Sequence, residues 1–64
     1  MRLALQVVNR PQANVLAMVL GNLAGKAGSV EVIVEATKPG GFDRGWLRNA
    51  VYEPLDEAGI DFEE

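Results

Sequence analysis

The chain has 64 residues with no cysteine and no histidine, which excludes disulfides, cysteine-based zinc sites and histidine as a general base. Hydrophobic residues make up 48% and charged residues 23%, which is typical of a globular chain and argues against disorder. The net charge of −3 divides into +3 over residues 1–48 and −6 over residues 49–64. We expect one domain, residues 1–64, whose thin core favours association with another copy or another chain.

The first expected element is a strand over residues 2–8. Leu3, Leu5 and Val7 share one face by the period of two, so this face predicts contact with a core. No apolar run near Met1 has the length of a signal peptide, and none reaches the roughly 20 residues of a membrane helix. We therefore expect a cytoplasmic protein without a membrane partner.

A helix is expected next, over residues 11–25, with Asn9 as a candidate N-cap. Its apolar residues recur at the spacing of one helix face and are Leu16, Val19, Leu20, Leu23 and Ala27. The stretch that follows, LAGKAGSV, contains a G-x-x-G with a lysine, Gly25 to Gly28. A phosphate-binding P-loop leaves a strand and enters a helix, whereas this loop does the reverse. We interpret it as a helix stop, with Lys26 near the last carbonyl groups.

The clearest strand pattern covers residues 29–37. Four small apolar residues point one way and are Val30, Val32, Val34 and Ala36. The opposite face carries Glu31, Ile33 and Glu35. We therefore expect one face of the strand to be buried and the other to be largely exposed to solvent. Ile33 between two glutamates is an apolar spot on the wet face, suited to packing under a partner.

Turn residues Lys38–Gly41 come next, and Asp43 is a candidate N-cap for a second helix. Pro54 interrupts the apolar stripe of this helix and predicts a kink or a break near residues 52–54. Gly59 is expected to end the helix. Ile60 and Phe62 alternate with acidic residues and suggest a short third strand.

The order strand–helix–strand–helix–strand predicts an α/β fold: a small two-layer β-α-β-α-β domain, a three-stranded sheet with both helices on one face. Such a sheet leaves two open edges, and open edges pair readily with another chain. The edge over residues 30–36 is therefore a candidate interaction surface.

Catalytic, cofactor and metal sites have little support in this sequence. Ser29 is the only serine, and no histidine is present to activate it. Neighbouring acidic residues on a helix or a strand point apart, so they form poor acid–base pairs. The acidic C-terminal end is either a solvated surface or a binding patch for a basic partner. Its residues do not form a calcium-binding loop with a glycine turn; they are Asp61, Glu63 and Glu64. We expect no catalytic residues, no cofactor and no metal.

Arg44 and Arg48, four residues apart on either side of Trp46, form a small basic and aromatic surface of the kind enriched at protein interfaces. The interaction candidates are therefore Ile33, Arg44, Trp46 and Arg48. An alternative reading is weak single-stranded nucleic-acid binding through Lys26, Lys38, Arg44, Arg48 and Trp46. A sequence pI near 4.7 makes a nucleic-acid partner the less favoured one.

Residues 31–62 resemble the C-terminal segment of large predicted bacterial AAA-type ATPases. The matching motifs are Val32–Ala36, Pro39–Phe42, and Val51–Leu55 followed by Gly59. The chain departs from the pattern by having Pro54 in the helix and no nucleotide-binding part. The resemblance implies an accessory interaction domain without ATPase activity. Together these patterns predict a non-enzymatic protein–protein interaction or assembly module, either homodimeric or accessory to a larger complex.

Overall fold

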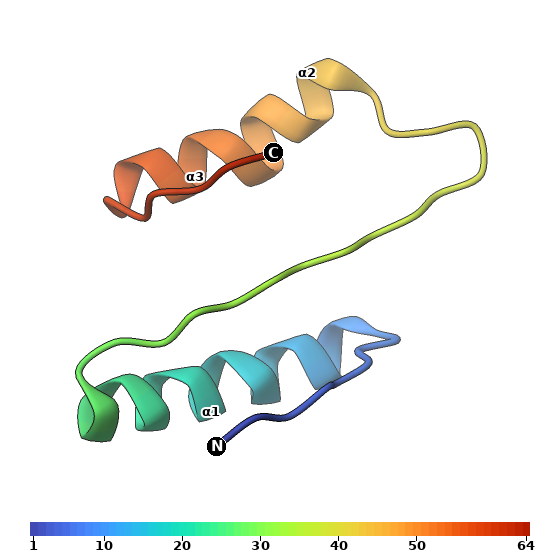
Figure 1. The fold of residues 1–64 in the computed structure, drawn as a ribbon. Coiled ribbons are helices and arrows are strands. Elements are labelled where there is room, and N and C mark those ends of the chain that lie inside the picture. The colour runs from blue at the N-terminus through green and yellow to red at the C-terminus, as the bar shows by residue number, and fades with distance from the viewer. The chain divides into compact units, whose positions relative to one another are not determined.

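The computed structural model describes residues Met1–Glu64 and contains helices but no β-strand (Figure 1). The elements in chain order are α1 (Arg10–Ala27), α2 (Arg44–Leu47), the π-helix η1 (Arg48–Tyr52) and α3 (Glu53–Glu57). The chain divides into two units, Met1–Ile33 and Val34–Glu64, and each is described by itself.

Helix α1 begins at a side-chain cap. The Asn9 side chain accepts a hydrogen bond from the Gln12 N–H at 2.9 Å, and the Gln12 side chain accepts one from the Val8 N–H at 2.9 Å. The first bond satisfies a backbone donor that the helix itself leaves unpaired, and the second holds the residue that precedes the cap. The expected N-cap is confirmed, and the helix extends slightly beyond the predicted range of 11–25.

Gly28 ends α1. Its φ of +83° is in the left-handed region, which favours glycine, and its N–H donates to the Ala24 carbonyl at 3.0 Å. Lys26 lies in the last turn, where the helix dipole favours a positive charge. The helix-stop interpretation of the G-x-x-G is therefore confirmed, with Gly25 still inside the helix.

Replacing Asn9 by alanine is expected to lower the free energy of unfolding by about 1 kcal/mol, because the Gln12 N–H loses its acceptor. Urea unfolding followed by circular dichroism measures this. Asn14→Ala, inside the same helix, is the matched control and is expected to cause no loss, since alanine is the better helix former. Equal losses from the two variants would contradict the capping role.

The second unit contains one continuous helical run, α2–η1–α3 (Figure 1). Asp43 caps it by accepting a hydrogen bond from the Trp46 N–H at 2.9 Å, which confirms the expected N-cap. Within η1 the turn is widened, and the Glu53 N–H donates to the Arg48 carbonyl five residues back. Pro54 follows at once; its ring crowds the preceding turn and it has no N–H to donate. The expected interruption is thus a π-turn just before Pro54 rather than a break.

Gly59 ends this run with the paired hydrogen bonds of a Schellman motif. The Ile60 N–H donates to the Leu55 carbonyl at 2.9 Å, and the Gly59 N–H to the Asp56 carbonyl at 3.0 Å. The chain then turns back along the helix, as Figure 1 shows. The turn at the start of the unit also forms, with the Gly41 N–H donating to the Lys38 carbonyl at 2.9 Å.

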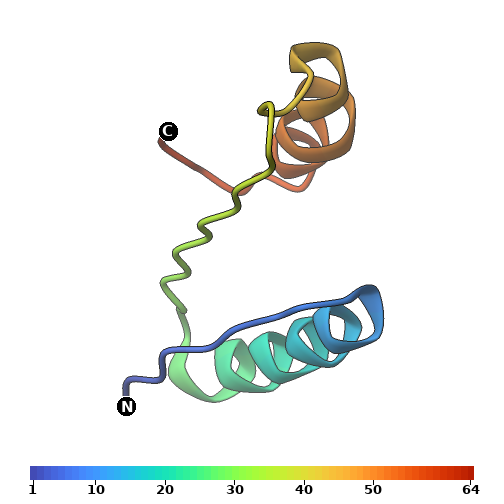
Figure 2. The same ribbon diagram turned by 90° about the vertical axis from the view of Figure 1, so that its right-hand side faces the viewer.

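The predicted α/β fold is wrong. Residues 2–8, 29–37 and 60–63 contain no strand, so there is no three-stranded sheet with helices on one face. A strand exists only where a second strand forms a ladder of hydrogen bonds with it. Alternation of apolar residues predicts which face is buried, but it does not identify the neighbouring strand. Residues 2–8 instead run along α1 (Figures 1 and 2).

Neither unit has a hydrophobic core. No side chain of the chain is buried. The least exposed residues of α1 are Leu16, Leu20 and Leu23, which are half-buried and share the predicted apolar face. The second unit also has half-buried residues along its helical run, among them Leu47, Val51 and Leu55. Each unit has formed its apolar face, and no other segment of the same unit buries that face.

Candidate interaction surface

An apolar groove runs between the N-terminal segment and α1 within the first unit. It has a volume of about 440 Å³. Its lining is mostly aliphatic: Leu3, Leu5, Gln6, Val7, Gln12, Val15, Leu16 and Val19. Leu5, at the middle of the segment, is still 63% exposed. The groove therefore presents aliphatic side chains to solvent, which monomeric proteins rarely do over a large area.

The second unit presents an aromatic surface at its N-terminal end. The Phe42 and Trp46 rings stack, with centroids 5.7 Å apart and planes 12° from parallel. Lys38 and Asp43 join them around a shallow hollow of about 310 Å³. Asp43 fixes the backbone of this first turn through the Trp46 N–H, and the indole stacks on Phe42. It remains 51% exposed, so one face is free for a partner.

Three of the four sequence-predicted interaction residues belong to this end of the second unit. Arg44 is the first residue of α2, Trp46 lies within α2 and Arg48 is the first residue of η1. Ile33 belongs to the first unit and is 80% exposed. Trp46 lies two residues from each arginine, a spacing at which side chains of a helix do not face each other. Ile33 lies on an extended segment.

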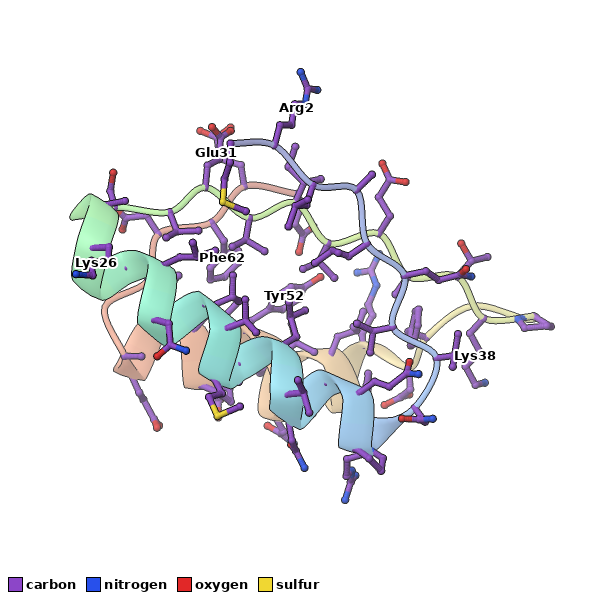
Figure 3. The ribbon with its side chains drawn as sticks, turned by 90° about the horizontal axis from the view of Figure 1, so that it is seen from below. Arg2, Lys26, Glu31, Lys38, Tyr52 and Phe62 are labelled. Atoms are coloured by element: carbon purple, nitrogen blue, oxygen red, sulfur yellow. The ribbon has the colours of Figure 1, made fainter.

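The residues of the nucleic-acid alternative are divided in the same way. Lys38, Arg44, Trp46 and Arg48 belong to the second unit, whereas Lys26 lies at the end of α1 in the first unit (Figure 3).

A second aromatic pair stabilises the return of the C-terminal residues. Tyr52 and Phe62 stack with centroids 5.4 Å apart and planes 10° from parallel (Figure 3). The Glu64 carboxylate beside the Tyr52 hydroxyl raises the pKa of that hydroxyl, first by accepting its hydrogen bond, then through desolvation and charge repulsion. All three interactions favour the neutral phenol.

Glu64→Gln is expected to lower the pKa of Tyr52 towards its ordinary value of 10.0, because the carboxylate that accepts its hydrogen bond and repels the phenolate is replaced by a neutral amide. The raised pKa implies a stabilisation that is complete below pH 10 and is lost as the pH rises through the folded-state pKa. Tyr52 is the only tyrosine, so an ultraviolet titration of tyrosinate reports on it alone. Glu63→Gln is the control, and an equal effect from it would contradict the assignment to Glu64.

Sequence reasoning missed three features. One is the contact of Phe42 with the predicted candidate Trp46, although the two residues have the four-residue spacing of side chains that meet on a helix. The Tyr52–Phe62 pair spans ten residues and depends on the reversal at Gly59, so no local spacing identifies it. The groove along α1 was also missed, because residues 2–8 were assigned to a sheet.

No three acidic side chains lie close enough to hold a metal ion, and this includes Asp61, Glu63 and Glu64. None of the helices combines the length and the apolar character needed to cross a bilayer.

Comparisons with known protein families, with curated proteins and with solved structures found no match for this chain.

Proposed function

We propose that this chain is a non-enzymatic assembly module that acquires its hydrophobic core by binding another protein chain. The observation that carries the proposal is that no side chain is buried, although the apolar faces of both units are formed. Folding of a chain is favourable only when enough apolar surface leaves water to offset the lost conformational entropy. A second chain supplies the missing cover.

The proposal predicts that folding is coupled to association. Thermal unfolding, followed by circular dichroism, is expected to have a midpoint that rises with protein concentration over about a hundredfold range. The physical reason is mass action, since the partner binds the folded chain and not the unfolded one. A cooperative transition whose midpoint stays constant over that range would contradict self-association.

An accessory role in a larger complex is the other form of this proposal. It takes its support from the resemblance of residues 31–62 to the C-terminal segments of AAA-type ATPases. In that form the stacked Phe42 and Trp46, with Arg44 and Arg48, serve as the contact surface. We place the module in the cytoplasm, where a chain without cysteine needs no oxidising environment.

Weak single-stranded nucleic-acid binding is the second candidate function. One observation favours it: Lys38 lies beside the stacked Phe42 and Trp46, and aromatic platforms next to basic residues hold bases and phosphates. Five net negative charges on residues 34–64 oppose it. A salt-dependent shift of a labelled oligonucleotide that Trp46→Ala abolishes would support this candidate, and the absence of any shift at low salt would exclude it.

A further inference from the structure

Two extended segments of the chain, residues 2–8 and 30–36, leave most of their backbone groups unpaired. Apart from the Val8 N–H, which donates to the Gln12 side chain, neither segment takes part in a hydrogen bond. Both have the alternating pattern of a half-buried strand. Segments with unpaired N–H and C=O groups and an apolar face are templates for pairing with another chain.

The apolar faces of the two segments match. Leu3, Leu5 and Val7 share one face of the first segment, and Leu3 and Leu5 are each 63% exposed. In the second segment Val30, Val32 and Val34 share one face, and all three are also exposed. Pairing the segments with these faces together would form a continuous aliphatic surface of six side chains.

The charges of the opposite faces select which segments pair. When Ala4 is placed opposite Ile33, Arg2 lies opposite Glu35 in an antiparallel ladder and opposite Glu31 in a parallel one. Either direction sets a positive charge against a negative one. Pairing of residues 30–36 with the same segment of another copy, centred on Ile33, sets Glu31 against Glu35, and like charges directly opposite each other are destabilising. Figure 3 shows Arg2 extending away from the backbone into solvent.

We propose that residues 2–8 of one copy pair with residues 30–36 of a second copy as neighbouring β-strands, with Ala4 opposite Ile33. The proposal rests on the assembly function above and specifies its partner as a second copy of this chain. A twofold axis repeats the contact, so that each dimer contains two such ladders. The observation that favours this occupant is the match in charge between Arg2 and the two glutamates of the second segment.

The test uses engineered cysteines, because the chain has none of its own. Ala4→Cys and Ile33→Cys are made as separate variants, mixed and oxidised. We expect a disulfide-linked pair that contains one chain of each variant, because opposite Cβ atoms in a ladder lie near disulfide distance. Only contact between copies yields this product, since each chain has a single cysteine.

A matched control mixes Ala4→Cys with Ser29→Cys, which lies about 13 Å along the strand from Ile33 and is expected not to link. Links only between identical positions, or no link in samples whose mass in solution is that of a dimer, would overturn the pairing and leave the assembly function standing. A chain that remains monomeric would overturn both.

Charge reversal gives an independent readout that needs no cross-link. Arg2→Glu is expected to weaken self-association about two- to thirtyfold, since two cross-strand pairs are lost per dimer. The double variant Glu31→Arg/Glu35→Arg is expected to weaken self-association for the same reason. An equimolar mixture of this double variant with Arg2→Glu is expected to restore binding, because opposite charges then face each other in both ladders. Failure of the mixture to bind more tightly than either variant alone would contradict the proposed charge pairing.

Discussion

Leu5→Lys is expected to abolish self-association at micromolar concentration. Leu5 lies at the middle of the N-terminal segment and lines the apolar groove along α1. Burial of a leucine side chain is worth about 1.5–3 kcal/mol, and a twofold dimer buries two copies. The dissociation constant is therefore expected to rise about 10²- to 10⁴-fold, which sedimentation equilibrium measures.

Gln6→Lys is the matched control for Leu5→Lys, because it introduces the same side chain one residue along. Its position alternates to the opposite face, where the proposed ladder places it against a glutamate. We expect binding that is unchanged or tighter. If Leu5→Lys bound as tightly as Gln6→Lys, the apolar face of residues 2–8 would not be part of the interface.

Pro54→Ala is expected to stabilise the second helical run by up to about 3 kcal/mol, the usual difference between proline and alanine inside a helix. Alanine restores the missing N–H and removes the ring that crowds the preceding turn. The π-turn of η1 is then expected to become regular α-helix, with the Glu53 N–H moving from the Arg48 carbonyl to that of Asn49. Amide hydrogen exchange and urea unfolding measure these two effects.

Pro11→Ala provides the comparison for Pro54→Ala. Pro11 lies in the first turn of α1, where an N–H has no partner within the helix. We therefore expect little change in stability from this variant. A π-turn that persists in Pro54→Ala would show that η1 is held by side-chain packing rather than by the proline.

The helix ends could be predicted because their signals are local. Asn9 and Asp43 each cap through a hydrogen bond to a backbone group three residues on, and Gly28 and Gly59 each end a helix at a positive φ. These interactions depend on a few neighbouring residues, so the sequence contains all of their participants.

The sheet could not be predicted correctly because strand pairing is not local. The valines of residues 30–36 show a strand period, yet the period does not say which chain supplies the neighbouring strand. A helix satisfies its own backbone, whereas a lone extended segment does not. The error therefore lies in treating a pattern that requires a partner as evidence for a sheet within one chain. The same unmet requirement is what leads to the assembly proposal.

The mass of the protein in solution tests self-association most directly, when it is measured by light scattering after size exclusion over a series of dilutions. We expect about twice the chain mass of 6.9 kDa at micromolar concentration, with loss of helical signal when dilution separates the copies. A mass of one chain, accompanied by a cooperatively folded state at every concentration, would contradict it.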